Sequence, residues 1–279
     1  MAEPFPPTSV VVGVDGSRVG ERAALWALQE AVGRDLPLHL LAAAENGDTD
    51  AAQTAVRSAA AAVAAAGPPI AVSTAVVAGS PAQVLLEASR RAAMLCVGAV
   101  GLKHSAHARV GSTAAALVAS AHCPVAVVRG AAGPASAAGS SGPAGWVVVE
   151  LDTTPEAAAV LQFAVAEARM RRAPLRVLGT WQSEDHDPQT ITESAQLVRA
   201  QLDRRLEQWR HRYPDLDVLP VAVRDSGLGY LAENGAAIQL VVLGAHASAA
   251  VAELLGPAGM SALHGSDCTI LVVDRQRLL

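Results

Sequence analysis

Four small residues near the middle of the chain have a spacing that suits the binding of phosphate. Gly98 and Gly101 are followed, after a gap of nine residues, by Gly111 and Ser112. Glycines can adopt positive φ angles and let backbone amide groups approach an anion with no Cβ in the way. A helix beginning near Ser112 would direct its unpaired amide groups and the positive end of its dipole at the same place. The pattern therefore predicts an anion site, and phosphate suits it best.

The elements predicted around these residues alternate between strands and helices. Short apolar runs in the first half predict strands over residues 10–14, 38–42, 70–77, 94–97 and 125–128. Helices are expected between them, over residues 20–32, 49–66, 81–89 and 113–121. Wholly apolar strands that alternate with helices are typical of a parallel sheet covered on both faces. Ligands of such sheets collect beyond the carboxyl ends of the strands, so Asp15 and Gly98, which directly follow the first and fourth strands, matter most.

The second half of the chain repeats the plan of the first. Residues 10–15 correspond to 147–152, and residues 122–128 correspond to 267–273. An uncharged stretch rich in Gly, Ser, Ala and Pro separates the two halves, as a flexible linker would. We predict a nucleotide-binding domain over residues 1–130, a linker over 131–145 and a second domain over 146–279. The fold class is α/β, with two tandem doubly wound domains that each contain a five-stranded parallel sheet.

Composition excludes several classes of protein. Hydrophobic residues make up 51% of the 279 positions and charged residues 17%, which rules out a disordered chain. The three cysteines lie far apart, which argues against a disulfide framework or a cysteine zinc site. A net charge of −5 argues against nucleic-acid binding. The sequence shows neither a signal peptide nor a membrane span, so we expect a cytoplasmic protein.

The glycine spacing resembles the signature of the universal stress protein family, specifically its ATP-binding branch. That signature is Gly-x2-Gly-x9-Gly-Ser/Thr, which residues 98, 101, 111 and 112 match without a gap. The opening Val-x-Val-Asp before Gly16, the turn Gly79-Ser80-Pro81 and the ending that starts at His122 match as well. The resemblance spans essentially the whole chain, because tandem bacterial members are common in the family. It implies an adenine-nucleotide α-hydrolase-like fold for each domain.

The resemblance also implies roles for particular residues. Gly13 and Asp15 would face the adenosine end of a nucleotide, and the end of the second strand would contact the adenine. The glycine signature would line the ribose and the phosphates. Asp15 with Gly16 could instead form only a turn or cap. The predicted nucleotide-binding residues are Gly13, Asp15, Ala42, Ala43, Val97, Gly98, Gly101, Lys103, Arg109, Gly111, Ser112 and Thr113.

The loop between the second and third glycines of the signature is basic. It contains Lys103, the only lysine of the chain, together with Arg109 and two histidines. Such side chains suit an anionic ligand. A solvated basic loop without a ligand is the equally simple alternative.

The second half has lost the signature. Glu150 stands where the first half has Gly13, and Asp225 stands where it has Gly79. Pro257 replaces Ser112 and lacks both an amide hydrogen and a hydroxyl. We therefore predict a degenerate universal stress domain that packs, dimerises or regulates and does not hold ATP in the usual way.

The resemblance leads to one main functional hypothesis and two alternatives. The first domain would bind ATP or a related adenine nucleotide, with or without Mg²⁺, in a stress-response role without catalytic residues. The alternatives are a slow ATPase or phosphotransferase, and an interaction scaffold that binds no nucleotide. The apolar final strands, over residues 125–128 and 270–273, could pair edge to edge within the chain or between chains, and we expect a homodimer. We expect no dedicated metal site, no nucleic-acid partner and no membrane partner.

Overall fold

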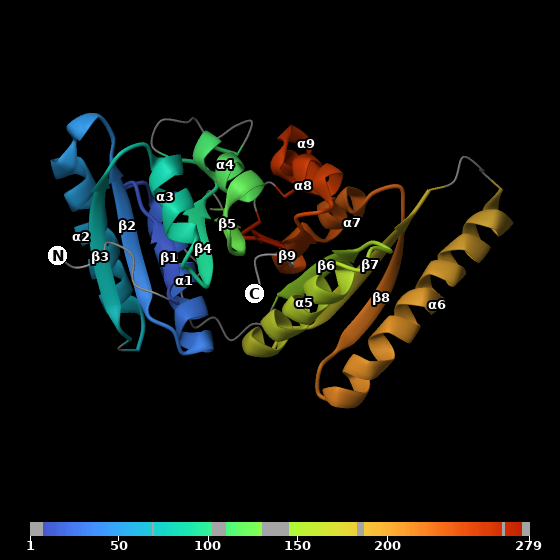
Figure 1. Ribbon diagram of the computed structural model, residues 1–279. Coiled ribbons are helices and arrows are strands. Elements are labelled where there is room, and N and C mark those ends of the chain that lie inside the picture. The colour runs from blue at the N-terminus through green and yellow to red at the C-terminus, as the bar shows by residue number, and fades with distance from the viewer. Residues whose placement is uncertain are drawn as a thin grey trace. The chain divides into compact units, whose positions relative to one another are not determined.

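The computed structural model describes residues 8–68, 70–101, 110–129, 145–182, 187–263 and 266–274 (Figure 1). The chain forms two compact units. The first comprises Met1–Ser140 together with Thr269–Val272 from near the end of the chain. The second comprises Ser141–Cys268 and Val273–Arg275. Each unit is described by itself below.

The sheet of the first unit is built from five parallel strands and one antiparallel strand. In sequence order the parallel strands are β1 (Val10–Gly13), β2 (Leu38–Ala44), β3 (Val72–Ala78), β4 (Met94–Gly98) and β5 (Val125–Val128). Their order in space is β3-β2-β1-β4-β5. This order puts β1 between β2 and β4, so the chain winds outward in both directions from β1. The crevice that a doubly wound sheet offers to ligands therefore lies where β1 and β4 end.

A strand from near the end of the chain covers β5. β10 (Thr269–Val273) runs antiparallel to β5, with Leu271 opposite Ala126. The sequence indicated a final strand here and left open whether it pairs within the chain or between chains. Pairing within the chain is what the structure shows, and it removes an exposed apolar edge.

Helices cover the sheet of the first unit in two pairs. α1 (Arg18–Arg34) packs with α2 (Thr49–Ala66), and α3 (Pro81–Ser89) packs with α4 (Ser112–Ser120) (Figure 1). The short 3₁₀ helix η1 (Glu45–Gly47) leads from β2 into α2. The buried faces of α1 and α2 are rich in alanine, which lets these two helices lie close to the strands. With aromatic residues at 3% of the chain, the core consists mainly of Val, Ala and Leu.

The second unit repeats four of the parallel strands. They are β6 (Trp146–Leu151), β7 (Leu175–Trp181), β8 (Val218–Arg224) and β9 (Ile238–Gly244), in the order β9-β6-β7-β8. The helical elements are α5 (Ala157–Arg171), α6 (Pro188–Arg212), α7 (Gly227–Asn234), η2 (Gly235–Ala237), α8 (Ser248–Leu255) and α9 (Pro257–Ala262). The predicted α/β class with two domains of mostly parallel sheet is therefore confirmed. The expectation of five parallel strands in the second domain is wrong, because β10, the strand expected as its fifth, pairs antiparallel with β5 in the first unit.

Candidate functional site

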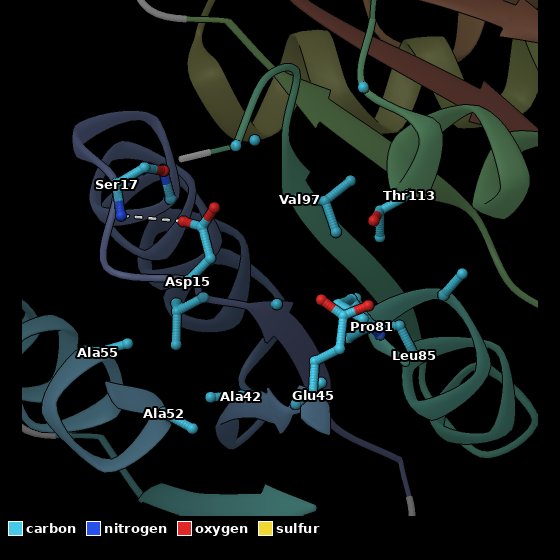
Figure 2. Close-up of a pocket in the computed structure, with 18 of the residues that line it drawn as sticks. Asp15, Ser17, Ala42, Glu45, Ala52, Ala55, Pro81, Leu85, Val97 and Thr113 are labelled. Atoms are coloured by element: carbon cyan, nitrogen blue, oxygen red, sulfur yellow. Dashed lines mark hydrogen bonds between the residues drawn. The ribbon is translucent and has the colours of Figure 1, made fainter. Parts of the chain in front are cut away.

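A cavity of about 570 Å³ opens at the carboxyl ends of β1, β2 and β4 in the first unit (Figure 2). Its walls come from the ends of these strands and from the N-terminal parts of α1, α2, α3 and α4. The volume falls within the range of small-molecule sites, roughly 300 to 1,000 Å³. The location is the one expected for a ligand of a doubly wound sheet.

The structure brings the residues predicted from the sequence together in this cavity. Ten of the twelve line it, and they come from four separate stretches of the chain. The other two, Lys103 and Arg109, lie outside the described residues. The ten are Gly13, Asp15, Ala42, Ala43, Val97, Gly98, Gly101, Gly111, Ser112 and Thr113.

Glycine is needed in this cavity for close approach, and not for the positive φ that we expected. The described glycines with positive φ are Gly16, Gly47 and Gly79, none of which belongs to the signature. At Gly98, a Cβ would lie 3.0 Å from Val19 Cγ1 and 3.3 Å from the amide nitrogen at the start of α1. The missing side chain therefore lets β4 and α1 meet closely beside the cavity.

Asp15 has the local capping role that the sequence left open, and it also borders the cavity. Its Oδ1 accepts a hydrogen bond of 2.9 Å from the amide of Ser17, which orders the turn into α1. The left-handed Gly16, with φ of 83°, completes this turn. On the far side, a Cβ at Gly101 would lie only 2.7 Å from Asp15 Oδ2. The carboxylate thus lies against bare backbone, solvent-exposed and part of the cavity wall.

The amide of Gly111 is not available to a ligand, which corrects one part of the predicted phosphate cradle. It donates a hydrogen bond of 2.7 Å to the carbonyl of Ala99. Gly111 is the N-cap of α4, and its own carbonyl accepts from Ala115. Helix geometry leaves the next amides, those of Ser112, Thr113 and Ala114, without an acceptor inside the helix. These three amides form the donor end of the cavity.

The helix N-termini around the cavity are capped unequally. Ser17 Oγ accepts from the amide of Gly20 at 3.0 Å, and Asp48 Oδ1 accepts from Ala51 at 3.1 Å, so α1 and α2 have side-chain caps. α3 and α4 have no side-chain cap, since Ser80 Oγ donates instead to Gln83 Oε1. The positive potential of a helix start is therefore least offset on the α3 and α4 side of the cavity.

The prediction missed a group of residues in the cavity wall. Two carboxylates are among them, Glu45 at the start of η1 and Asp48 at the start of α2. Glu45 directly follows β2, so its position at a strand end was the available signal. The small side chains come from one face of α2, where their spacing of three and four residues shows in the sequence. The missed residues include Leu41, Glu45, Asn46, Asp48, Ala51, Ala52, Ala55, Ser80, Pro81 and Leu85.

In the second unit, the corresponding crevice is filled by side chains. The space left at the end of β6 is about 10 Å³, bounded mainly by leucines and by Glu150 and Glu253. A Cβ at Gly227, the first residue of α7, would lie 2.7 Å from Glu150 Oε2. Asp225 replaces Gly79 at the equivalent turn and keeps a positive φ of 65°. The glutamate that stands in place of Gly13 thus occupies the crevice itself.

The charges of this second crevice shift the pKa values of its acids. Burial, and then the neighbouring carboxylates of Glu253 and Asp152, raise the pKa of Glu150 above its ordinary value. Burial also acts to raise the pKa of Asp152, but hydrogen bonds from Thr154 and the nearby His246 outweigh it and lower that pKa. The imidazole Nε2 of His246 lies 3.0 Å from Asp152 Oδ2. An anionic ligand would meet negative charge here.

The described parts of the chain hold no group of three or more His, Cys, Asp or Glu side chains able to bind a metal ion. None of the helices described is both long enough and apolar enough to cross a membrane.

Comparison with known proteins identifies the family. The model of the Universal stress protein family matches residues 8–129 and, again, residues 146–274. The chain belongs to the universal stress protein family. Like the tandem members, this universal stress protein carries the domain twice.

Its relatives and its structural neighbours agree with this assignment. The chain is 41% identical over 290 residues to universal stress protein Rv2028c of Mycobacterium tuberculosis (strain ATCC 25618 / H37Rv), with 100% of both chains covered. It is 35% identical over 277 residues to Rv2624c of the same strain, with 96% of each covered. Among solved structures, a universal stress protein from Archaeoglobus fulgidus DSM 4304 has a TM-score of 0.66 over 98% of each chain. Its sequence identity of 15% makes this a likeness of fold.

Proposed function

We propose that the first unit binds ATP or a related adenine nucleotide and that occupancy regulates this stress protein. The observation that carries the proposal is the convergence of ten predicted residues on one cavity that ends at the open N-terminus of α4. A filled crevice or a wall of bulky side chains would have argued against a nucleotide. Instead the walls are mostly Gly, Ala, Ser and Thr.

The two ends of the cavity suit the two ends of a nucleotide. The amides of Ser112, Thr113 and Ala114 suit phosphate, because helix N-termini stabilise anions. The carboxylate of Asp15 accepts hydrogen bonds, as a ribose hydroxyl requires. If Mg²⁺ accompanies the phosphates, we expect Asp15 to face it through water.

We propose binding without efficient turnover. Two of the carboxylates in the described cavity wall have structural tasks, since Asp15 accepts a hydrogen bond from the amide of Ser17 and Asp48 accepts one from the amide of Ala51. The second unit would serve as a regulatory or assembly partner, since Glu150 and the leucines around it occupy its crevice. A cytoplasmic location and a homodimer belong to the same proposal.

Calorimetric titration with ATP tests this function. Gly111→Val should abolish measurable binding, because the added side chain enters the cavity at the α4 N-terminus. The variant should fold, since φ at Gly111 is −61° and a Cβ there would meet nothing closer than 3.5 Å. The matched control is Gly229→Val in the second unit, where a Cβ has open space. Equal ATP affinity in wild type and Gly111→Val would exclude the site, and no ATP binding by wild type would exclude the function.

A further inference from the structure

We propose that the outer edge of β3 pairs antiparallel with the same edge of a second copy of this chain, about a two-fold axis at Ala75. β3 lies at one end of the sheet of the first unit, beside β2, and no described strand pairs with its other side (Figure 1). The inference rests on the homodimer in the proposed function and names the surface that forms it. It does not depend on whether the cavity holds a nucleotide.

The hydrogen bonds at the two ends of the β2–β3 pairing show which backbone groups of β3 point outward. The amide of Leu38 donates to the carbonyl of Ala71 at 2.9 Å, and the amide of Gly79 donates to the carbonyl of Ala44 at 3.2 Å. Between these bonds the parallel register continues without a shift. Alternate residues of a parallel strand bond to the same neighbour. The residues that bond to β2 are therefore Ser73, Ala75 and Val77, and those with outward amides and carbonyls are Val72, Thr74, Val76 and Ala78.

The outer edge of β3 lacks the features that keep a strand edge from pairing. Proteins protect such edges with charged side chains, proline, bulges or a covering element. The strand reads Val-Ser-Thr-Ala-Val-Val-Ala, with no charge and no proline, and its register has no bulge. No residue of β3 is buried, and Val72 is 40% exposed. The edge therefore offers both hydrogen-bonding groups and apolar surface to another strand.

The second unit supplies a comparison, because its edge strand β8 has the same geometry. The amide of Leu175 donates to the carbonyl of Asp217, and the amide of Asp225 donates to the carbonyl of Trp181, both at 2.8 Å. These bonds correspond to the two that flank β3. The outward positions of β8 therefore begin at Val218 and correspond one by one to those of β3.

Two outward positions of β8 carry residues that protect an edge. Pro220 stands where β3 has Thr74, and it has no amide hydrogen to donate. Arg224 stands where β3 has Ala78 and adds a charge. Within sheets, proline is found on edge strands where its missing amide would face away from the neighbouring strand. The second unit thus closes its edge at the positions where the first unit leaves its own edge open.

β3 is complementary to itself when two copies run antiparallel. With the axis at Ala75, Thr74 of each copy lies opposite Val76 of the other, and Val72 lies opposite Ala78. Opposite residues with outward amides and carbonyls exchange both hydrogen bonds in an antiparallel ladder. No like charges meet, because the strand has none. A two-fold contact uses the same surface of both copies and closes at two, so a second copy is the partner that this edge fits.

Sedimentation velocity of the full chain without nucleotide tests the pairing. Wild type should show an equilibrium between monomer and dimer that depends on concentration. Thr74→Pro should weaken the dimer about a hundredfold, because each copy loses an outward amide and leaves a carbonyl of the other copy unpaired. Thr74→Val is the matched control, since it keeps the amide and should dimerise as wild type does.

Thr74→Pro should fold, so that its effect on association can be measured. The amide of Thr74 makes no bond to β2, and the sheet of the second unit accommodates Pro220 at the equivalent position. Circular dichroism and thermal unfolding of the variant check this point. Thr74 lies outside the cavity wall, so the variant should also bind ATP as wild type does.

Hydrogen exchange locates the contact within β3. In concentrated wild type the amides of Thr74 and Val76 should exchange slowly, and dilution to monomer should speed their exchange at least about tenfold. The amides of Ala75 and Val77 bond to β2 and should exchange at the same rate in both states. This alternation distinguishes a paired strand edge from a contact that merely covers β3.

The outcomes separate this inference from nucleotide binding. A wild type that stays monomeric up to about 0.1 mM would overturn the inference and the proposed homodimer, and nucleotide binding would still stand. A Thr74→Pro dimer as tight as that of wild type would show that the dimer uses another surface. Assemblies larger than a dimer would overturn the two-fold pairing. Failure of wild type to bind ATP would end the nucleotide proposal and leave the β3 contact as it is.

Discussion

At the scale of single residues, the glycines of the signature act through the atoms that they bring into contact. Gly101 lies against the carboxylate of Asp15, and Gly98 lies against the backbone of α1. Gly111 has more room, since the nearest atom to an added Cβ is 3.5 Å away. The three glycines of the motif therefore differ in what an added side chain would meet. Substitutions at these positions should therefore have different consequences.

Gly101→Ala should weaken nucleotide binding through Asp15. The new methyl group would lie 2.7 Å from Asp15 Oδ2 and would displace the carboxylate. We expect a loss of about tenfold in affinity, and a much smaller loss when the same change is made in Asp15→Ala, because coupled neighbours are not additive. Calorimetry on the four proteins of this double-mutant cycle measures the coupling. Equal losses in both backgrounds would contradict it.

Gly98→Ala should destabilise the first unit. The methyl group would lie 3.2 Å from the carbonyl carbon of Val19 and 3.3 Å from the amide nitrogen of Gly20, both of which are backbone atoms. Overpacking of this kind costs about 1 to 3 kcal/mol. Urea unfolding of Gly98→Ala and of Gly111→Ala as the control gives the difference, and comparable stability of the two variants would count against the steric account.

At the scale of elements, the two units use the same strand ends differently. β1 and β4 end at Gly13 and Gly98, whose bare backbone lets Leu85 and the start of α1 pack closely, and the cavity stays open beside them. At β6, Glu150 projects into the corresponding space and meets Glu253 from α8. The open helix start in the first unit is that of α4, whereas the residue that opens α9 in the second is Pro257, which has no amide hydrogen. The open cavity of the first unit and the filled crevice of the second thus differ by a few residues on the same arrangement of strands and helices.

Glu150→Gln should stabilise the second unit at neutral pH. Burial and nearby carboxylates raise the pKa of Glu150 in the folded chain, so folding takes up a proton. The unfolding free energy of wild type therefore falls as pH rises from the ordinary value of 4.5 through the raised pKa. Glu150→Gln removes this dependence, and its advantage should vanish at pH values below 4.5.

Tryptophan fluorescence can follow the unfolding of the second unit at each pH, because Trp146, Trp181 and Trp209 belong to that unit. Glu207→Gln, at an exposed position on α6, is the control and should leave the pH dependence as it is. The prediction would be refuted if the unfolding free energies of wild type and Glu150→Gln changed by the same amount between pH 5 and pH 7.

At the scale of the whole molecule, the first unit is completed by residues from near the end of the chain. Thr269–Val272 belong to it, and β10 covers the edge of β5. β5 is apolar throughout and buried along its length. An uncovered edge of this kind invites pairing with another chain. A homodimer of the full chain that used a sheet edge of the first unit would therefore form at β3, the strand at the other end of this sheet.

A chain that ends at residue 265 should expose β5. Without β10, Val125, Ala126 and Val127 lose their antiparallel partners, so the backbone amides of β5 should exchange hydrogen faster. The exposed strand edge should also make the protein self-associate. Hydrogen exchange and light scattering measure the two effects. A chain that ends at Asp274 retains β10 and is the control. Unaltered exchange in β5 of the shorter chain would show that β10 does not protect this edge.

ATP should raise the stability of the full chain if the first unit binds it. A ligand at 100 times its dissociation constant adds about 2.7 kcal/mol to the unfolding free energy of the unit that holds it. Calorimetric scans with and without ATP should shift one transition in wild type and none in Gly111→Val. A shift of the same size in both proteins would place the nucleotide elsewhere.

Much of this protein followed from local patterns in its sequence. Strand and helix positions in the first half agree with the structure within about two residues at most ends, because runs of Val, Ala and Leu bounded by glycine, proline and capping residues are local signals. The glycine spacing located most of the cavity, since parallel strands place their carboxyl ends at one edge. The family also followed from this spacing, and the match over both halves of the chain confirms it.

Only the tertiary structure decided which atoms come into contact at the carboxyl ends of the parallel strands. The sequence shows that Glu45 follows a strand, but only the structure shows that its side chain points into the cavity, where β2 lies beside β1 and a left-handed turn follows. The amide of Gly111 is used by Ala99, and β10 pairs with β5 across more than 140 residues of chain. Periodicity and caps depend on residues a few positions apart, which a sequence displays. Contacts between distant segments depend on how the whole sheet assembles, and no local pattern in the sequence indicates them.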